Sequence, residues 1–205
     1  MKDMKNEPWL MDKYNQVCQS RIPGYALVSL KIKRFRIFNR LYDRETGDLL
    51  IEKVYEVLED WLEDGEYIAR IYLDYYNILM RFPDDYDALF ARVIEMNRIV
   101  RDMPYEPFQG KIFSGLGIFP LPEEPVDFYT AQYNADICRN ECPQSPYRNS
   151  HFEVYGVTYR DNNLLAFDLA QNLLPAIEAG HIKLYLQPKV DLRTGEITRA
   201  EALVR

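Results

Sequence analysis

The sequence predicts an α/β (α+β) sandwich in which helices cover a mostly antiparallel central sheet. Two patterns carry this prediction. Several short runs alternate apolar and polar residues, as strands do, and longer runs repeat apolar residues every three or four positions, as amphipathic helices do. The runs follow one another as strand, helix, hairpin, helix, strand, helix and strand. Since 47% of the 205 residues are hydrophobic, the chain can bury a substantial core.

A strand, a helix and a hairpin are predicted in the first half of the chain, after a polar N-terminal arm or short helix. Apolar residues alternate over 25–33, which predicts the first strand. A helical apolar pattern begins at 47–48 and stops at 64–65. Two β-rich runs, 67–75 and 76–82, then follow each other with almost no spacer, so they predict a tight hairpin.

Further helices and strands are predicted up to residue 155. Asp84 or Asp85 is the expected N-cap of a helix, because its carboxylate can accept the free backbone N–H groups of the first turn. A strand is predicted over 111–119, a helix over 125–141 and a short strand over 150–155.

The remaining residues predict one helix and two strands, which are too few to close a core. The helical pattern covers 161–178, and the strands cover 182–186 and 197–204 with a turn at 191–195. We therefore expect this tail to pack on the first domain, to pair with another chain, or to be part of a larger domain.

The charge balance limits the partners that the whole surface suits. There are 25 Lys and Arg against 32 Asp and Glu, a net charge of −7. An acidic chain is a poor partner for a nucleic acid polymer or an anionic membrane as a whole. No apolar run is long enough to cross a membrane, and the first residues are too polar for a signal peptide, so a cytoplasmic location without a membrane segment is expected.

The tail resembles the opening of an EAL domain, the cyclic-di-GMP phosphodiesterase barrel of bacteria. The resemblance rests on Leu-Tyr-Leu-Gln-Pro-Lys-Val-Asp-Leu at 184–192 and Glu-Ala-Leu-Val-Arg at 201–205. It implies that Gln187 and Arg205 contact the cyclic dinucleotide and that Glu201 binds Mg or Mn. These roles require the rest of the EAL domain in cis, so we expect this chain alone to need no cofactor and to hydrolyse nothing.

The stretch before the tail is similar to a GGDEF domain, the diguanylate cyclase fold, in element order and in signature positions. The resemblance implies that Asn39 and Asp48 read a guanine and that Arg36 faces a phosphate. The local alternative is that Asn39 only caps a loop and that Gly47 and Asp48 only begin a helix. The signature positions that match are Phe35, Arg36, Asn39, Tyr42, Gly47 and Asp48.

The same resemblance shows where the catalytic positions have degenerated. Lys31 and Lys33 stand where the family has acidic residues, so cations replace metal ligands and repel Mg²⁺. Asp136 stands where a phosphate-binding Lys is usual, which suggests an ion pair between Lys31 and Asp136. The signature hairpin reads Tyr72, Leu73, Asp74, Tyr75 and Tyr76, of which only Asp74 is a carboxylate. The tyrosines are expected to serve cross-strand packing or a partner surface.

Three functions remain open from these residues. The favoured one is a catalytically inactive GGDEF-like regulatory or dimerisation domain, whose complete protein is an EAL phosphodiesterase. The second is a module that senses GTP, or another nucleotide such as cyclic-di-GMP, and controls the EAL domain. The third is an active diguanylate cyclase, which the missing metal carboxylates argue against. The expected divisions are an N-terminal arm at 1–24, a degenerate GGDEF-like domain at 25–157, and a linker helix with the first strands of a truncated EAL domain at 158–205.

Overall fold

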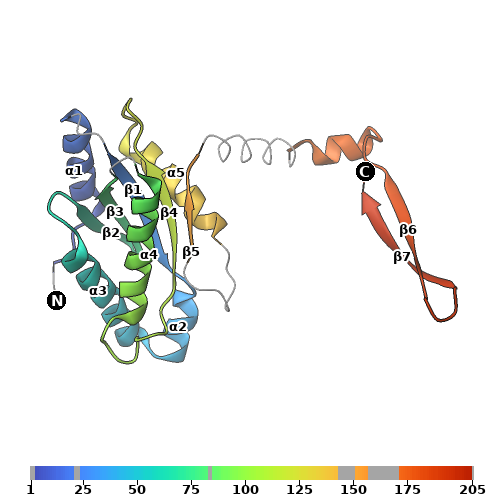
Figure 1. Cartoon of the computed structure of the whole chain (residues 1–205), viewed down its shortest axis with the longest axis horizontal. Helices are drawn as coiled ribbons and strands as arrows, with labels where there is room; N and C mark the ends of the chain where they lie inside the picture. The colour runs from blue at the N-terminus through green and yellow to red at the C-terminus, as the bar shows by residue number, and fades with distance from the viewer. Residues whose placement is uncertain (1–2, 21–23, 83–84, 143–150, 157–170, 205) are drawn as a thin grey trace. The chain divides into compact units, whose positions relative to one another are not determined.

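The computed structural model comprises two compact units, Met1–Tyr155 and Gly156–Arg205 (Figure 1). Each unit is considered by itself below. The residues that the structure describes are 3–20, 24–82, 85–142, 151–156 and 171–204.

The first unit is built on a five-stranded sheet with the strand order β2-β3-β1-β4-β5. The central strand β1 pairs antiparallel with β3 on one side and β4 on the other, and β4 pairs parallel with β5. The predicted mixed fold with a mostly antiparallel sheet is therefore confirmed. The strands are β1 (Tyr25–Ile32), β2 (Tyr67–Tyr72), β3 (Tyr75–Arg81), β4 (Ser114–Pro120) and β5 (His151–Val154).

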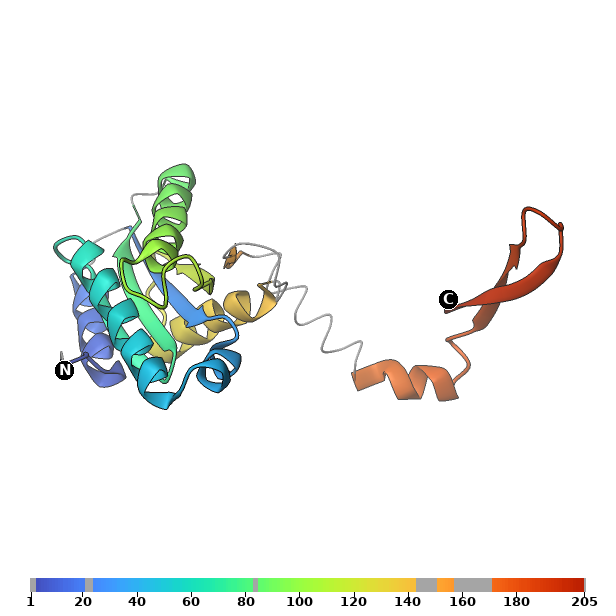
Figure 2. The ribbon, with the colours of Figure 1, turned by 90° about the horizontal axis from the view of Figure 1, so that it is seen from below.

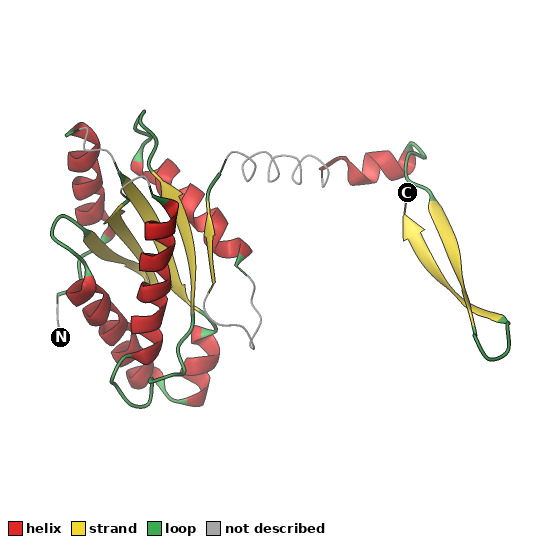
Figure 3. Cartoon of the chain, viewed as in Figure 1, coloured by secondary structure: helices red, strands yellow, loops and turns green. Residues whose placement is uncertain are grey.

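Helices cover both faces of this sheet (Figures 1 and 3). Alternate residues of β1 enter two separate cores: Val28 and Leu30 pack under α2, α3 and α4, whereas Leu27 packs under α1 and α5. Figure 2 shows α3 and α4 side by side on their face of the sheet. The helices are α1 (Glu7–Gln19), α2 (Phe35–Leu41), α3 (Arg44–Trp61), α4 (Tyr86–Asp102) and α5 (Phe128–Glu141).

Side-chain caps fix where four of these helices begin. Asp85 accepts the backbone N–H groups of Asp87 and Ala88 and caps α4, as one of the two predicted alternatives. The N-cap of α3 is Asp43, which accepts the Thr46 N–H at 2.6 Å, so α3 begins at Arg44 and not at the predicted 47–48. The other two caps are Asn6 before α1 and Asp127 before α5.

The helix α2 was not predicted. It has only seven residues, and its N-cap, Arg34, makes no side-chain hydrogen bond to the helix. Arg34 instead has a positive φ of 58°, and β1 ends one residue earlier than predicted. A short helix without a capping side chain leaves no recognisable start signal in the sequence.

The hairpin turn lies two residues earlier than predicted. Tyr72 pairs with Tyr75, so Leu73 and Asp74 form the tip. Leu73 has φ 45°, in the left-handed region that favours glycine. The family resemblance expects glycine at this position, so the turn keeps a backbone conformation suited to glycine although the residue is leucine.

Other boundaries differ from the predictions by a few residues. The segment before β4 closes in turns, with the Lys111 N–H bonded to the Phe108 carbonyl, so that strand starts at Ser114 and not at 111. The predicted helix over 125–141 starts at Phe128 because Asp127 caps it. The short strand predicted over 150–155 is observed at His151–Val154.

The N-terminal segment before α1 closes part of the outer edge of β2. The Arg70 N–H on β2 donates a 2.9 Å hydrogen bond to the Lys5 carbonyl. The Lys5 N–H in turn donates to the Tyr55 hydroxyl at 3.1 Å. The residues ahead of α1 are therefore part of the fold of the first unit.

The second unit contains a helical stretch at 171–178 and an antiparallel pair, β6 (Leu184–Val190) and β7 (Ile197–Val204). The strand predicted at 182–186 corresponds to β6, which starts two residues later and ends four residues later. The strand predicted at 197–204 is observed with the same bounds as β7. The first part of the predicted helix at 161–178 lies outside the described residues. Across all described ranges, no helix is both long and apolar enough for a membrane crossing.

Candidate functional site

The candidate site lies where the tip of the β2–β3 hairpin meets the end of β1. The Ile32 N–H donates to the Asp74 carbonyl at 3.3 Å, which holds the tip against β1. The next residue, Lys33, donates its N–H to the Phe113 carbonyl at 2.8 Å. The helix α5 covers this part of the sheet, so side chains from β1, β3 and α5 converge here.

Asp136 on α5 is the acceptor at the centre of a polar network. Its Oδ1 accepts a 2.7 Å hydrogen bond from the Ser29 hydroxyl on β1 and another of 2.7 Å from the Tyr75 hydroxyl on β3. Its carboxylate also pairs with Arg139 at 3.1 Å, one helical turn further along. Arg139 itself donates to the Ser29 hydroxyl at 2.8 Å. The four side chains therefore form a network of hydrogen bonds and one ion pair among themselves.

Arg139 is held in place by packing as well as by charge. Its side chain is only 10% exposed, and its guanidinium lies 4.5 Å from the ring centre of Tyr75. A Cβ at Gly115 would lie in ordinary contact with Lys33, Cys142 and Arg139, so these three side chains gather over that glycine. The Arg139 guanidinium therefore interacts with the Asp136 carboxylate and the Tyr75 ring.

The ion pair expected between Lys31 and Asp136 is replaced by the pair between Arg139 and Asp136. The reason is the register: Ser29 lies beneath Asp136, and Lys31 is two positions further along β1, roughly 7 Å away along the strand. Lys31 is exposed at that point.

Asp74, the remaining carboxylate of the signature hairpin, is buried. Its residue is 6% exposed, and its Oδ2 has no hydrogen-bond partner among the described residues. Burial raises the pKa of this carboxyl, and the nearby cations Lys31, Arg139 and Arg36 only partly oppose that shift. The site thus combines one buried acid with several cations around it.

A pair of catalytic metal ions does not fit this donor set. Hard divalent cations need several oxygen ligands, and the family resemblance implies more than one carboxylate. Where the resemblance expects acidic residues, this chain has Lys31 and Lys33, and burial raises the pKa of Asp74. In the part of the chain that the structure describes, no group of three or more His, Cys, Asp or Glu side chains could hold a metal ion.

The two predicted guanine-reading residues lie on adjoining helices. Asn39 on α2 packs against Gly47 on α3, because a Cβ at Gly47 would lie 1.9 Å from the Asn39 Oδ1. This places Asn39 beside the backbone that leads to Asp48. The Asn39 Oδ1 is buried and finds no hydrogen-bond partner within the described ranges, whereas Asp48 is exposed, 4.0 Å from Arg44.

The hairpin tyrosines divide between packing and exposure. Tyr76 is fully buried, and its hydroxyl donates to the Ile51 carbonyl at 2.9 Å. Tyr75 serves the network around Asp136, and Tyr72 is exposed. Core packing of Tyr76 matches the expectation for this cluster, and Tyr72 remains available at the tip beside Leu73.

Two buried polar residues of the site were not anticipated. Ser29 and Asn77 are paired positions on β1 and β3, and both are fully buried. Neither Asn77 side-chain atom, Oδ1 or Nδ2, has a partner in the described part of the chain. A polar residue in the middle of each apolar strand was the available signal, since buried polar groups ordinarily mark a network.

The EAL-like residues of the second unit lie on one hairpin. Gln187 on β6 is the register partner of Glu201 on β7, and Glu201 pairs with Lys189 at 2.9 Å. Arg205 lies outside the described residues. The metal and dinucleotide roles of these residues stay predictions.

The chain has relatives among curated proteins, although no protein-family model matches it. It is 22% identical over 188 residues to the cyclic di-GMP phosphodiesterase NbdA of Pseudomonas aeruginosa, covering 92% of this chain and 24% of that protein. It is 24% identical over 205 residues to the bifunctional diguanylate cyclase/cyclic di-GMP phosphodiesterase MucR of the same bacterium, covering 98% of this chain and 30% of that protein. The chain thus spans less than a third of these relatives.

Solved structures show the same fold. The S helix-GGDEF-EAL structure of Vibrio cholerae LapD, bound to c-di-GMP, matches with a TM-score of 0.66 and 15% identity over 98% of this chain and 47% of that chain. The active GGEEF domain of a Vibrio cholerae diguanylate cyclase matches with a TM-score of 0.63 and 13% identity over 75% of this chain and 99% of that chain. Likeness at this identity establishes the fold alone: the chain has the fold of GGDEF domains.

Proposed function

We propose that this GGDEF fold has become a catalytically inactive regulatory domain of a cyclic-di-GMP signalling protein. The observation that carries the proposal is the closed network of Asp136, Arg139, Ser29 and Tyr75. A nucleotide triphosphate needs cationic side chains that are free to bind it. Here the Arg139 guanidinium on α5 is neutralised by Asp136, a carboxylate that stands where the resemblance expects a lysine.

The residues around the hairpin tip support the same conclusion. Lys31 and Lys33 lie where metal ligands are needed, and a buried Asp74 with a raised pKa is a weak substitute. Without a metal pair, activation of a hydroxyl for attack on a phosphate loses its main electrostatic support.

The regulated activity that we propose for the complete protein is EAL-type phosphodiesterase action. The relatives named above include phosphodiesterases, and this chain spans only part of each of them. In that complete form, Glu201 would bind Mg or Mn, and Gln187 and Arg205 would contact the cyclic dinucleotide. A homodimer formed through the GGDEF-type domain is a further part of the proposal.

Nucleotide sensing is the second candidate. It is favoured by the contact between Asn39 and Gly47, which holds a buried amide oxygen beside the start of α3. Asn39 and Asp48 could then read a base while the phosphate grip is lost. Such a module would bind GTP weakly and transmit the binding to the EAL domain.

Two measurements on the chain separate these functions. Incubation with GTP and Mg²⁺ or Mn²⁺ is expected to give no cyclic-di-GMP, and turnover would overturn the inactive assignment. A thermal titration with GTP then tests sensing, because a ligand at 100 times its dissociation constant adds about 2.7 kcal/mol of stability. Stabilisation that is lost in Asn39→Ala and Asp48→Ala, and retained in the exposed control Glu45→Ala, would assign a sensor.

A further inference from the structure

The segment that contains α2 carries a local positive charge on an acidic chain. Residues 31–42 include five cations and no acid, although the whole chain has a net charge of −7. The cations are Lys31, Lys33, Arg34, Arg36 and Arg40. Residues 31–42 are therefore locally basic although the chain as a whole is acidic.

The helix α2 presents one apolar and one basic row to solvent. Phe35 is buried and Phe38 packs against Phe108, which fixes the inner side of the helix. Residues four apart are neighbours on a helix surface, so Arg36 lies beside Arg40 and Ile37 beside Leu41 on the outer side. We call these four residues the α2 face.

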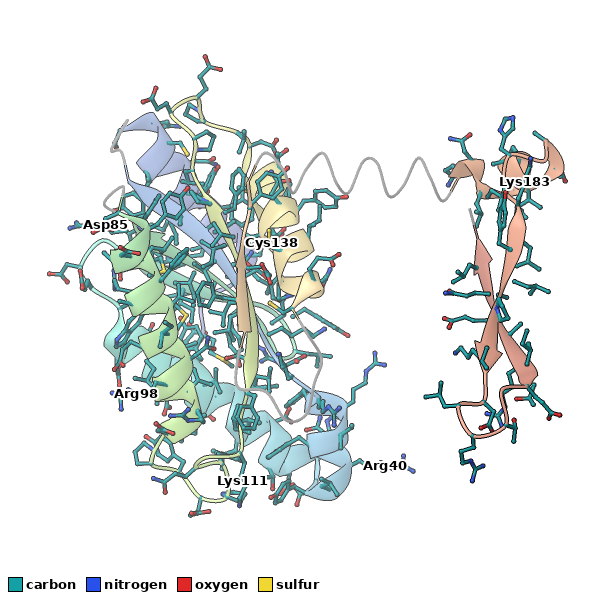
Figure 4. The ribbon with its side chains drawn as sticks, turned by 45° about the vertical axis from the view of Figure 1, so that its right-hand side comes forward. Arg40, Asp85, Arg98, Lys111, Cys138 and Lys183 are labelled. Atoms are coloured by element: carbon teal, nitrogen blue, oxygen red, sulfur yellow. The ribbon has the colours of Figure 1, made fainter. Side chains whose placement is uncertain are left out.

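The apolar row is unusually open to solvent. Ile37 is 51% exposed and Leu41 is 74% exposed, and Tyr42 next to them is also exposed. Figure 4 shows the side chain of Arg40 extending from α2 away from the rest of the first unit. Single exposed aliphatic residues are common, but two adjacent ones beside Arg36 and Arg40 form a patch that combines apolar and cationic groups.

Arg36 and Arg40 differ from two cations of the helix α4. Arg98 and Arg101 on α4 pair with Glu95 and Asp102. No acidic side chain of the described residues forms an ion pair with Arg36 or Arg40. Their charge is therefore available to an external anion.

We infer that the α2 face docks reversibly on an anionic membrane surface. Basic side chains are attracted to anionic headgroups, and the aliphatic side chains beside them can enter the boundary between headgroups and acyl chains. The inference shares Arg36 with the candidate site but does not rest on loss of catalysis, since it uses the outer side of α2 and not the inner side that carries Asn39.

A lipid surface fits this patch better than a protein or a nucleotide. Seven helical residues span only about 10 Å, so one face of α2 offers much less area than the roughly 800 Å² that each partner buries in a standard protein interface. A nucleotide would neutralise the cations but would leave Ile37 and Leu41 in water. A bilayer can accept Ile37 and Leu41 at its acyl boundary and pair its anionic headgroups with Arg36 and Arg40. It does not need a large complementary surface.

The test is cosedimentation of the chain with vesicles. One set contains equal parts phosphatidylcholine and phosphatidylglycerol, and the other contains phosphatidylcholine alone. We expect binding to the anionic set only, weakened by salt. Arg40→Gln should reduce the partition about fivefold, since one cation near such a surface is worth about that factor, and Ile37→Ser with Leu41→Ser should reduce it further.

Matched controls use exposed residues outside the α2 face. Ile94 on α4 is 58% exposed, so Ile94→Ser tests the loss of an aliphatic side chain. Lys183 in the second unit, labelled in Figure 4, tests the loss of a cation as Lys183→Gln. Both variants should bind the anionic vesicles as the unaltered chain does, and circular dichroism should show that all variants are folded.

Three outcomes would overturn the inference. The first is equal binding to neutral and anionic vesicles, and the second is equal loss in the control variants. The third is no binding to either set of vesicles. Saturable binding to polyglutamate that Arg40→Gln removes would then assign the α2 face to an acidic protein.

Discussion

The Tyr75 hydroxyl donates a 2.7 Å hydrogen bond to the Asp136 carboxylate and so connects the signature hairpin to α5. The resemblance to diguanylate cyclases implies that the hairpin and the Asp136 position on α5 would both lie near a substrate. Here the hairpin and α5 are instead joined by the protein's own side chains. The predictions that follow test the network around Asp136, the buried carboxyl groups of Asp74 and Glu66, and the turn at Leu73.

Asp136 should be energetically coupled to Arg139 and not to Lys31. Residues that share a hydrogen-bonded ion pair show coupling of about 0.5–3 kcal/mol, whereas separated residues are additive within about 0.3–0.5 kcal/mol. Double-mutant cycles with Asp136→Ala, Arg139→Ala and Lys31→Ala, read by urea unfolding, measure both values. A coupling to Lys31 as large as that to Arg139 would contradict the geometry.

Asp74→Asn should stabilise the protein at neutral pH. Burial raises the pKa of Asp74, so the folded state resists its ionisation, and the charged form costs stability as pH rises through the unfolded value of 3.8 and up to the folded value. Below 3.8 both states are protonated and the gain should vanish. Urea unfolding from pH 3 to 8 is the measurement, with the exposed Asp64→Asn as control. A uniform effect at all pH values would contradict this reason.

Glu66→Gln should destabilise the protein at neutral pH, the opposite of the effect expected for Asp74→Asn. Glu66 is buried, which would raise its pKa, but hydrogen bonds from Arg92 and from the backbone N–H groups of Glu63 and Arg81 hold the pKa below its usual value. Its stabilising effect is therefore present above pH 4.5 and lost as pH falls through the lower folded value.

We expect Glu66→Gln to lower the free energy of unfolding at pH 7 by about 3 kcal/mol, because it removes the buried carboxylate that pairs with Arg92 and leaves only the longer 3.6 Å pair with the exposed Glu63. The same variant should flatten the acid limb of the stability curve. The exposed Glu124→Gln is the control and should change neither. An acid limb as steep as that of the unaltered chain would show that Glu66 is not the titrating group.

Leu73→Gly should stabilise the hairpin by about 0.5–1 kcal/mol. The left-handed conformation costs a leucine roughly 1–2 kcal/mol, and part of the gain is offset by the greater freedom of glycine in the unfolded chain. Tyr72→Gly is the matched control, because it places glycine at the neighbouring strand residue and should destabilise. Thermal unfolding distinguishes the two, and equal destabilisation by both would argue against strain at Leu73.

The sequence was most informative where the signals are local. The caps and apolar rows of α4 lie within one segment, and Asp85 was one of two candidates for its start. The helix α2 escaped prediction because Arg34 gives it no capping side chain. The position of the turn at Leu73 and Asp74 depends on cross-strand pairing, which the run of β-forming residues does not specify.

The sequence predicts which residues of the candidate site are unusual, but not which side chains they contact. Lys31, Lys33 and Asp136 stand out against the family pattern in the sequence alone. The choice of Arg139 as the partner of Asp136 depends on helix spacing together with the register of Ser29 beneath it. Asn77 gave only a weak signal, since one polar residue in an apolar strand does not say what it faces.

The contact between Lys5 and Arg70 has a consequence for handling the protein. β2 is the outermost strand of its sheet, and the Lys5 carbonyl occupies the Arg70 N–H that would otherwise be free at that edge. Removing the residues ahead of α1 would open an unpaired edge to strands of other molecules, the usual beginning of aggregation. Shortened versions of this chain that start at α1 should therefore precipitate more readily than those that keep the preceding residues.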